Sequence, residues 1–232
     1  MANSEVIHNM AYEKILDVLH LTHVFEENLN VDVIKGRVDY LRKYNKKVYK
    51  DARKQYIYSI ALFTLFVENV SLFSQFYIIM HLNRNKAVMK DCAQQVQYTR
   101  NEEMLHAQVG IKLINTLREE YPDLFDEELE ARVKEECIDA LKAESKVIDW
   151  IMGDYEVKGL SADILKSFIA KRMADSLDQI GFDSSEIVYD QSHVDETFWF
   201  DEELYGANMT DFFQKRPVEY AKGQGISADD LF

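Results

Sequence analysis

The amino-acid sequence predicts an all-α protein, and three observations carry that prediction. Only two prolines and eight glycines occur in 232 residues, so the chain has few residues that end helices. Apolar residues recur at helical spacing, and no stretch alternates apolar and polar residues as a half-buried strand would. With 47% hydrophobic residues, the chain can bury a large core. We therefore expect one helical domain over residues 1–207, followed by a flexible C-terminal tail over residues 208–232.

Most of the chain divides into helical segments separated by short polar links. Pro122 ends one segment, because proline disfavours a helical residue before it, and Gly153 and Gly181 end two later ones. The composition after Gly181 becomes acidic, aromatic and irregular, which favours loops over long helices. In chain order, the expected helices span residues 4–29, 31–53, 56–82, 87–120, 126–152 and 163–177, with a basic link at 83–86.

The central segment, 56–82, is apolar almost all the way round, yet Glu68 and Asn69 lie in its middle. An isolated buried carboxylate is too costly for a folded protein to carry, so we expect Glu68 to have a partner. The segment is long enough to cross a bilayer, but its interior polar residues would each be costly in lipid. We therefore interpret it as the central helix of a soluble bundle.

Net charge and cysteine content narrow the function classes. The formal net charge of -14 makes binding to nucleic acid or to an anionic membrane unfavourable. The first residues, MANSEVIHNMAYEK, lack the basic start and apolar run of a signal peptide. Cys92 and Cys137 form no metal-binding motif, so we expect buried thiols in a reducing compartment and a cytoplasmic location.

Two Glu-x-x-His pairs are the main chemical signal in the sequence. Glu5 and His8 form the first pair, and Glu103 and His106 form the second. The i, i+3 spacing places both side chains on one helix face, where a carboxylate and an imidazole can bind the same metal. One such pair is common by chance and most often consists of a solvated Glu beside an ordinary His. Two pairs on either side of an apolar helix with a lone Glu are much rarer.

This set of side chains is the one that a di-iron carboxylate site requires. Two cations about 3.5–4 Å apart need bridging carboxylates to offset their mutual repulsion. Di-iron helical bundles draw a Glu from each of two helices and a Glu-x-x-His pair from each of the other two. We therefore expect two iron ions, or manganese, with open positions for O2. The expected metal ligands are Glu5, His8, Glu68, Glu103 and His106.

The stretch SEVIHNMAY resembles the radical-generating small subunit of class I ribonucleotide reductase. It carries Glu5, His8 and, one helical turn later, Tyr12. In the family, a tyrosine at that offset carries the stable radical, so the resemblance implies this role for Tyr12 and a ferritin-like bundle. Leu72 and Phe76 stand where the family has bulky apolar residues that shield the radical from water.

The stretch RNEEMLH resembles the second ligand motif of the family, Arg-Asp-Glu-x-x-His. Here Arg100 lies one residue further from the histidine, and Glu102 stands where an aspartate is typical. Glu102 and Glu103 are therefore both candidate ligands. We favour Glu103, because its spacing to His106 repeats that of the first pair. We expect Glu102 to lie next to the ligands without binding the metal itself.

The C-terminal stretch DFFQKRPVEYAKGQ resembles the family segment whose tyrosine relays the radical to the large subunit, and Tyr220 occupies that place. The final ADDLF resembles the peptide that docks on the large subunit. The resemblance implies that this chain serves deoxyribonucleotide synthesis for DNA replication as a component of an oxidoreductase. The large subunit, and not this chain, would bind and reduce the ribonucleotide, and the small subunit would form a homodimer.

Part of the family pattern has no match in this sequence. The family has a sixth ligand on a helix before the first Glu-x-x-His pair, and an upstream tryptophan that neither Trp150 nor Trp199 matches. We expect a split subunit, whose N-terminal piece is a separate chain that supplies the sixth ligand. A truncated chain, or replacement of the ligand by another residue such as Glu144, are the alternatives.

Two other functions remain open at this point. The chain could be another ferritin-like di-metal oxidase or oxygenase with its own small substrate, which would not need Tyr220 or the docking peptide. It could also be a scaffold that keeps the fold without the metal.

Overall fold

The computed structural model describes residues 2–207, which contain helices and a single isolated β-bridge between Val157 and Leu160. The all-α prediction is therefore confirmed. The chain divides into two units, Met1–Thr197 and Phe198–Phe232, and each is described by itself. In the second unit the described element is helix α10 (Phe198–Ala207). The first unit contains α1 (Ala2–Val18), α2 (Thr22–Asn28), α3 (Asp32–Leu41), η1 (Arg42–Asn45), α4 (Ala52–Leu62), η2 (Phe63–Val67), α5 (Phe73–Lys86), α6 (Lys90–Glu120), η3 (Pro122–Leu124), α7 (Glu127–Met152), α8 (Ala162–Gln179) and α9 (Gln191–Glu196).

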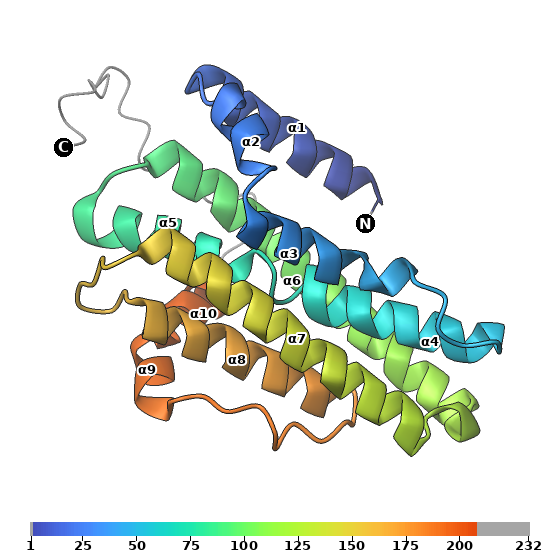
Figure 1. Cartoon of the computed structure of the whole chain (residues 1–232). Coiled ribbons are helices and arrows are strands. Elements are labelled where there is room, and N and C mark those ends of the chain that lie inside the picture. Colours follow the sequence, from blue (N-terminus) through green and yellow to red (C-terminus); the bar gives the residue numbers. More distant parts are fainter. Residues whose placement is uncertain (1, 208–232) are drawn as a thin grey trace. The chain divides into compact units, whose positions relative to one another are not determined.

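The long helices of the first unit lie side by side (Figure 1). Helix α7 contacts α3, α4 and α8, and α6 contacts α4 and α5. Helix α1 lies at the edge of the bundle, where it contacts α6 and α2. Apolar side chains from these helices fill the space between them, and each fully buried one contributes about 1.5–3 kcal/mol to stability. Fully buried examples are Leu65, Ile114, Val147 and Leu165.

Several helices begin where the sequence provides a capping side chain. Asp126 accepts a hydrogen bond from the amide of Leu129 at the start of α7, and Ser161 accepts one from the amide of Ile164 at the start of α8. These caps satisfy amides that have no partner within the first turn of a helix. The expected helices 87–120, 126–152 and 163–177 are accordingly found as α6, α7 and α8, with ends shifted by at most three residues.

The central stretch 56–82 is not one helix, so that prediction is wrong. It consists of the end of α4, the π-helical turn η2, turns over residues 68–72, and most of α5. Glu68 lies in the turns directly after η2. Apolar residues occur all round this stretch, so its hydrophobic pattern gave no sign of where the regular helix is interrupted.

The expected helix over 4–29 is also wrong, because it is split into α1 and α2. His20 has a positive φ of 57°, and its amide donates to Asp17 O while the amide of Leu21 donates to Leu16 O. This pattern is a Schellman motif, in which glycine usually occupies the left-handed position. The sequence has histidine there, so no glycine marked the helix end.

Smaller differences occur on both sides of the central stretch. The expected helix 31–53 ends earlier, since α3 and η1 reach only Asn45. The basic residues 83–86 belong to α5, and the link to α6 is formed by residues 87–89, where Ala87 and Met89 have positive φ. The irregular region after Gly181 contains the short helix α9.

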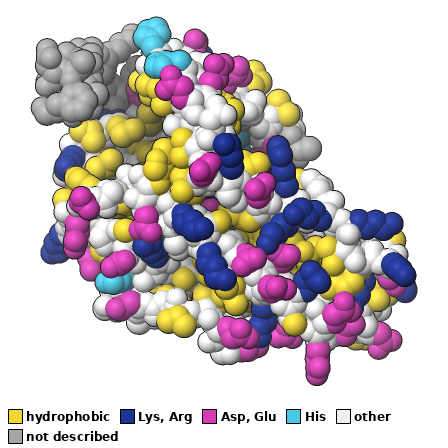
Figure 2. All heavy atoms as spheres, in the orientation of Figure 1, with side chains coloured by type: hydrophobic (Ala, Val, Ile, Leu, Met, Phe, Trp, Pro, Cys, Tyr) yellow, Lys and Arg dark blue, Asp and Glu magenta, His cyan; other side chains and the backbone are white. Residues whose placement is uncertain are grey.

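On the face shown in Figure 2, acidic and basic side chains are interleaved and apolar side chains are exposed between them. No helix among residues 2–207 is long and apolar enough to cross a membrane.

Candidate metal centre

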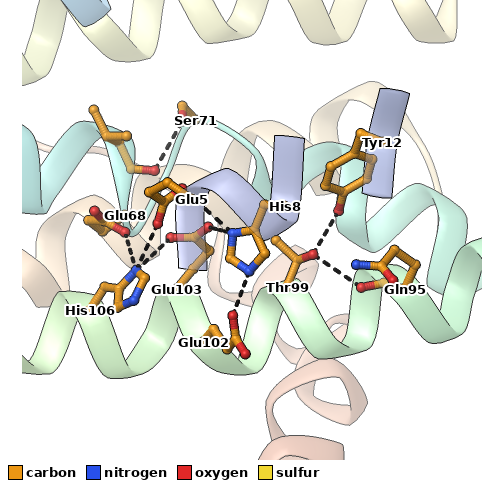
Figure 3. Close-up of polar contacts among 11 residues, drawn as sticks. Glu5, His8, Tyr12, Glu68, Ser71, Gln95, Thr99, Glu102, Glu103 and His106 are labelled. Atoms are coloured by element: carbon orange, nitrogen blue, oxygen red, sulfur yellow. Dashed lines mark hydrogen bonds and ion pairs between the residues drawn. The ribbon is translucent and has the colours of Figure 1, made fainter. Parts of the chain in front are cut away.

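Three segments that are far apart in the sequence bring their polar side chains to one place (Figure 3). Helix α1 contributes Glu5 and His8, the turn after η2 contributes Glu68, and the middle of α6 contributes Glu103 and His106. Each Glu-x-x-His pair lies on one helix, so its two side chains share a face.

Four of these side chains form one compact cluster. Glu5, Glu68, Glu103 and His106 each have a ligand atom within 4.8 Å of those of the others. The Nδ1 atom of His106 lies 3.2 Å from a Glu5 oxygen, 3.2 Å from a Glu68 oxygen and 3.4 Å from a Glu103 oxygen. One imidazole nitrogen and three carboxylates therefore surround a common point, which is the donor set that divalent iron or manganese accepts.

His8 adjoins this cluster and is oriented by Glu102. Its Nε2 atom lies 2.6 Å from Glu102 Oε2, at hydrogen-bond distance. Its Nδ1 atom is buried and makes no hydrogen bond, although it lies 3.1 Å from Glu103 Oε1. In a neutral histidine whose one nitrogen donates to a carboxylate, the other nitrogen carries no proton, as metal binding requires. Glu102 thus lies behind His8, whereas Glu103 lies in the cluster.

Burial makes this cluster unfavourable without a cation. Glu68 and Glu103 are only 2% and 4% exposed, and loss of solvation raises the pKa of both carboxyl groups. A hydrogen bond with Glu68 and the charge of Glu68 raise the pKa of Glu103 further. Neighbouring buried carboxylates repel each other unless one is protonated or a cation lies between them. The residues present therefore fit a bound metal, and the Nδ1 atom of His8, which makes no hydrogen bond and lies beside Glu103, fits it as well.

Tyr12 lies beyond His8 on the same face of α1. Its hydroxyl donates to Thr99 Oγ1 at 3.1 Å, and Thr99 donates to Gln95 O at 3.1 Å. Burial raises the pKa of Tyr12, while the hydrogen bond with Thr99 lowers it. Thr99 is 1% exposed and was not singled out from the sequence. The signal that could have found it is its position on α6, one turn before Glu103 and on the same helix face.

The two residues expected to shield Tyr12 differ in their environment. Phe76 is 3% exposed and belongs to the core. Leu72 is 37% exposed, so within the described residues it does not form a barrier against water. Leu72 lies in the turns before α5, where the backbone departs from the helix that the sequence suggested.

Glu144 does not join the cluster. Its carboxylate is fully buried and accepts hydrogen bonds from Nε and Nη2 of Arg37 and from the hydroxyl of Tyr40. Because both oxygens are bound within this network, Glu144 is not the replacement ligand that the sequence left open. Both cysteines are free thiols, with Cys137 buried as expected and Cys92 only partly so.

The positions expected in the C-terminal tail, Tyr220 and the final ADDLF, lie outside the described residues. Their assigned roles therefore stay predictions.

Comparisons with a family model and with curated proteins agree with one another. Residues 1–204 match the family model described as ribonucleotide reductase, small chain. Among curated proteins, a "Probable ribonucleoside-diphosphate reductase small subunit" of Invertebrate iridescent virus 3 is 27% identical over 94% of this chain and 61% of its own length. The ribonucleoside-diphosphate reductase subunit beta of Halalkalibacterium halodurans is 26% identical over 98% of this chain and 65% of its own. The chain thus spans less than two thirds of the length of these relatives.

A solved structure shares the fold. The ribonucleotide reductase R2 subunit from Clostridium botulinum superimposes with a TM-score of 0.71 at 19% identity, covering 87% of this chain and 63% of that one.

Proposed function

The chain belongs to the small-chain family of ribonucleotide reductase, and on that basis we propose that it is the radical-generating subunit of a class I enzyme. The observation that carries the proposal is the convergence of Glu5, Glu68, Glu103 and His106 from three separate segments, with Tyr12 nearby on α1. In this role the chain is the oxidoreductase component that supplies a radical, and a large subunit reduces the ribonucleotide.

We propose that the metal site holds two iron ions, or manganese. The side chains that would hold them are those of Glu5, His8, Glu68, Glu103 and His106. When bound, such a metal pair with O2 supplies an oxidant strong enough to remove one electron from a nearby phenol. The protein keeps the donors in place beforehand, because Glu68, Glu103 and both histidines are buried in the packed bundle.

The protein also controls protons in the site. Glu102 holds His8 in the tautomer that leaves Nδ1 unprotonated towards the cluster. Thr99 holds the hydroxyl of Tyr12 at α6 and can either accept its proton in a hydrogen bond or donate one to its oxygen. We propose that Tyr12 is the residue oxidised, that Phe76 helps to exclude water, and that Tyr220 passes the radical to the large subunit.

The outer face of α1 has exposed apolar residues, which are evidence for a partner chain. Val6 and Met10, each two residues from His8, lie on the opposite face of the helix, and both are more than half exposed. A helix with metal ligands on one face and exposed apolar residues on the other needs burial on both sides. We propose that a second polypeptide, which supplies a sixth carboxylate ligand, covers this face. A homodimer of small subunits, docking of the C-terminal residues on the large subunit and a cytoplasmic location complete the proposal.

Metal analysis and electron spin resonance test the proposal on the chain purified with everything that co-purifies. We expect about two iron or manganese ions per chain and a stable tyrosyl signal. Tyr12→Phe should abolish the signal, whereas Tyr98→Phe, at a half-exposed tyrosine on α6, should leave it unchanged.

Three outcomes would contradict parts of the proposal. Near-zero metal would support a scaffold without metal. A signal that survives Tyr12→Phe would remove Tyr12 from the mechanism. Full oxidase activity after deletion of residues 221–232 would favour a ferritin-like oxidase with its own substrate.

A further inference from the structure

Glu68 is carried by a backbone segment that is not α-helical. The amide of Glu68 donates to Phe63 O at 3.3 Å, and the amide of Ser71 donates to Phe66 O at 2.9 Å, in both cases five residues back. Single π-helical turns of this kind are rare and occur frequently at functional sites. These amides bond five residues back and not four, and contacts from neighbouring helices add to these bonds in holding Glu68.

Helix α8 holds the segment on the C-terminal side of Glu68. Arg172 donates from Nε to Asn69 O at 3.0 Å and from Nη2 to Asn69 Oδ1 at 2.7 Å. Its guanidinium carbon lies 3.7 Å from the centroid of the Phe73 ring, and the Asn69 amide donates to Ser176. One guanidinium group therefore binds both the main chain and the side chain of the residue next to Glu68.

Helix α6 approaches the segment on the N-terminal side of Glu68. Gly110 lies four residues after His106, and Thr64 lies four residues before Glu68. A Cβ atom at Gly110 would lie 2.1 Å from Thr64 Oγ1 and 2.7 Å from Thr64 Cγ2, which is far inside van der Waals contact. Thr64 is 2% exposed, so its side chain has no open space to move into. Only glycine at position 110 permits this approach of α6 to η2.

We propose that Arg172 and Gly110 are positioning residues that together set the place of the Glu68 carboxylate in the metal site. Gly110 brings the segment close to α6, which also carries His106, and Arg172 fixes the segment one residue after Glu68. The result is the observed 3.2 Å between Glu68 Oε2 and His106 Nδ1. The inference rests on the proposed function in one respect, because it assumes that the cluster binds a metal.

The test for Gly110 uses a matched glycine and a compensating change. Gly110→Ala should weaken binding of Mn²⁺ alone, measured by titration calorimetry on the chain with its co-purifying partners, by about 10–100-fold. Gly36→Ala on α3 is the control and should bind Mn²⁺ as the wild type does, because no atom lies within 4 Å of the added Cβ. Gly110→Ala combined with Thr64→Ala removes the closest clashing atoms and should restore most of the affinity.

The test for Arg172 uses a matched arginine. Arg172→Lys keeps the positive charge but loses the fork that binds Asn69 twice, so Mn²⁺ affinity should again fall by about 10–100-fold. Arg118→Lys is the control, since Arg118 also donates to a main-chain oxygen, Ile180 O, and also lies over phenylalanine rings. It makes these contacts away from the cluster and should leave Mn²⁺ affinity unchanged.

Hydrogen exchange of the metal-free protein provides a readout that does not depend on the metal. The amides of residues 64–72 should exchange about tenfold faster in Gly110→Ala and Arg172→Lys and at the wild-type rate in both controls. Wild-type exchange and wild-type Mn²⁺ affinity in both variants would overturn the inference. If the wild type binds no Mn²⁺, the proposed function fails, and the exchange rates alone decide whether Gly110 and Arg172 hold the segment.

Discussion

Replacing Arg37 by methionine should strongly destabilise the protein, because it leaves a buried carboxylate without its cation. The side chain of Glu144 is 0% exposed and that of Arg37 is 14% exposed. The guanidinium donates to Glu144 at 2.7 Å and 2.5 Å and to Gln75 Oε1 at 3.1 Å. Breaking a buried, hydrogen-bonded pair by removing one partner costs about 3–5 kcal/mol. We therefore expect Arg37→Met to lower the free energy of unfolding by that amount at about pH 8.

The loss should depend on pH in a defined direction. Burial raises the pKa of Glu144, and the charge and hydrogen bond of Arg37 lower it. Without Arg37, the folded-state pKa rises further, so the folded protein holds a proton that the unfolded chain releases. The penalty should therefore shrink as the pH falls towards the ordinary carboxyl value of 4.5 and grow as the pH rises.

Urea unfolding followed by far-ultraviolet circular dichroism, at about pH 5.5 and about pH 8, measures both effects. The double variant Arg37→Met with Glu144→Gln removes the unpaired charge and should recover much of the lost stability. A penalty below about 1 kcal/mol, or one that is independent of pH, would refute this reasoning. Metal content should be unchanged in the double variant, because Glu144 lies outside the metal cluster.

Three further predictions concern the site itself. Thr99→Val removes the hydrogen bond to Tyr12 and should raise the pKa of Tyr12, measured by fluorine resonance of fluorotyrosine at that position. Thr116→Val should leave that pKa unchanged, because Thr116 bonds to a main-chain oxygen of α6 as Thr99 does but does not contact Tyr12. The metal-free protein should lose stability in urea unfolding as the pH rises from 4.5 to about 8, because the folded state raises the pKa of Glu103, and Glu103→Gln should reduce this loss. Glu102→Ala should weaken Mn²⁺ binding about 10–100-fold in calorimetry; wild-type affinity would contradict its role beside His8.

The two Glu-x-x-His pairs could be found from the sequence because they follow from local geometry. Any α-helix places residues i and i+3 on one face, so Glu5 with His8 and Glu103 with His106 needed no tertiary information. Glu68 could be found because a lone carboxylate in an apolar stretch must have a partner. The choice between Glu102 and Glu103 was open in the sequence, and packing of α1 against α6 places one behind His8 and the other in the cluster.

Sequence patterns could not show the interruption of the central stretch. A π-helical turn and an α-helix have similar apolar requirements, so the bonds of Glu68 and Ser71 to residues five positions back are invisible in composition. The end of α1 was missed for a related reason, since His20 stands where glycine would normally signal a helix end.

The all-α class, most of the long helices and the types of residue that could bind a metal could be predicted from the amino-acid sequence. These follow from periodicity, from the scarcity of helix-breaking residues and from the spacing of acids and histidines, all of which are local properties. Which of those side chains meet depends on how the helices pack together. Contacts such as Gly110 with Thr64, Arg172 with Asn69 and Tyr12 with Thr99 join residues that are far apart in the chain, and their formation depends on how whole helices pack.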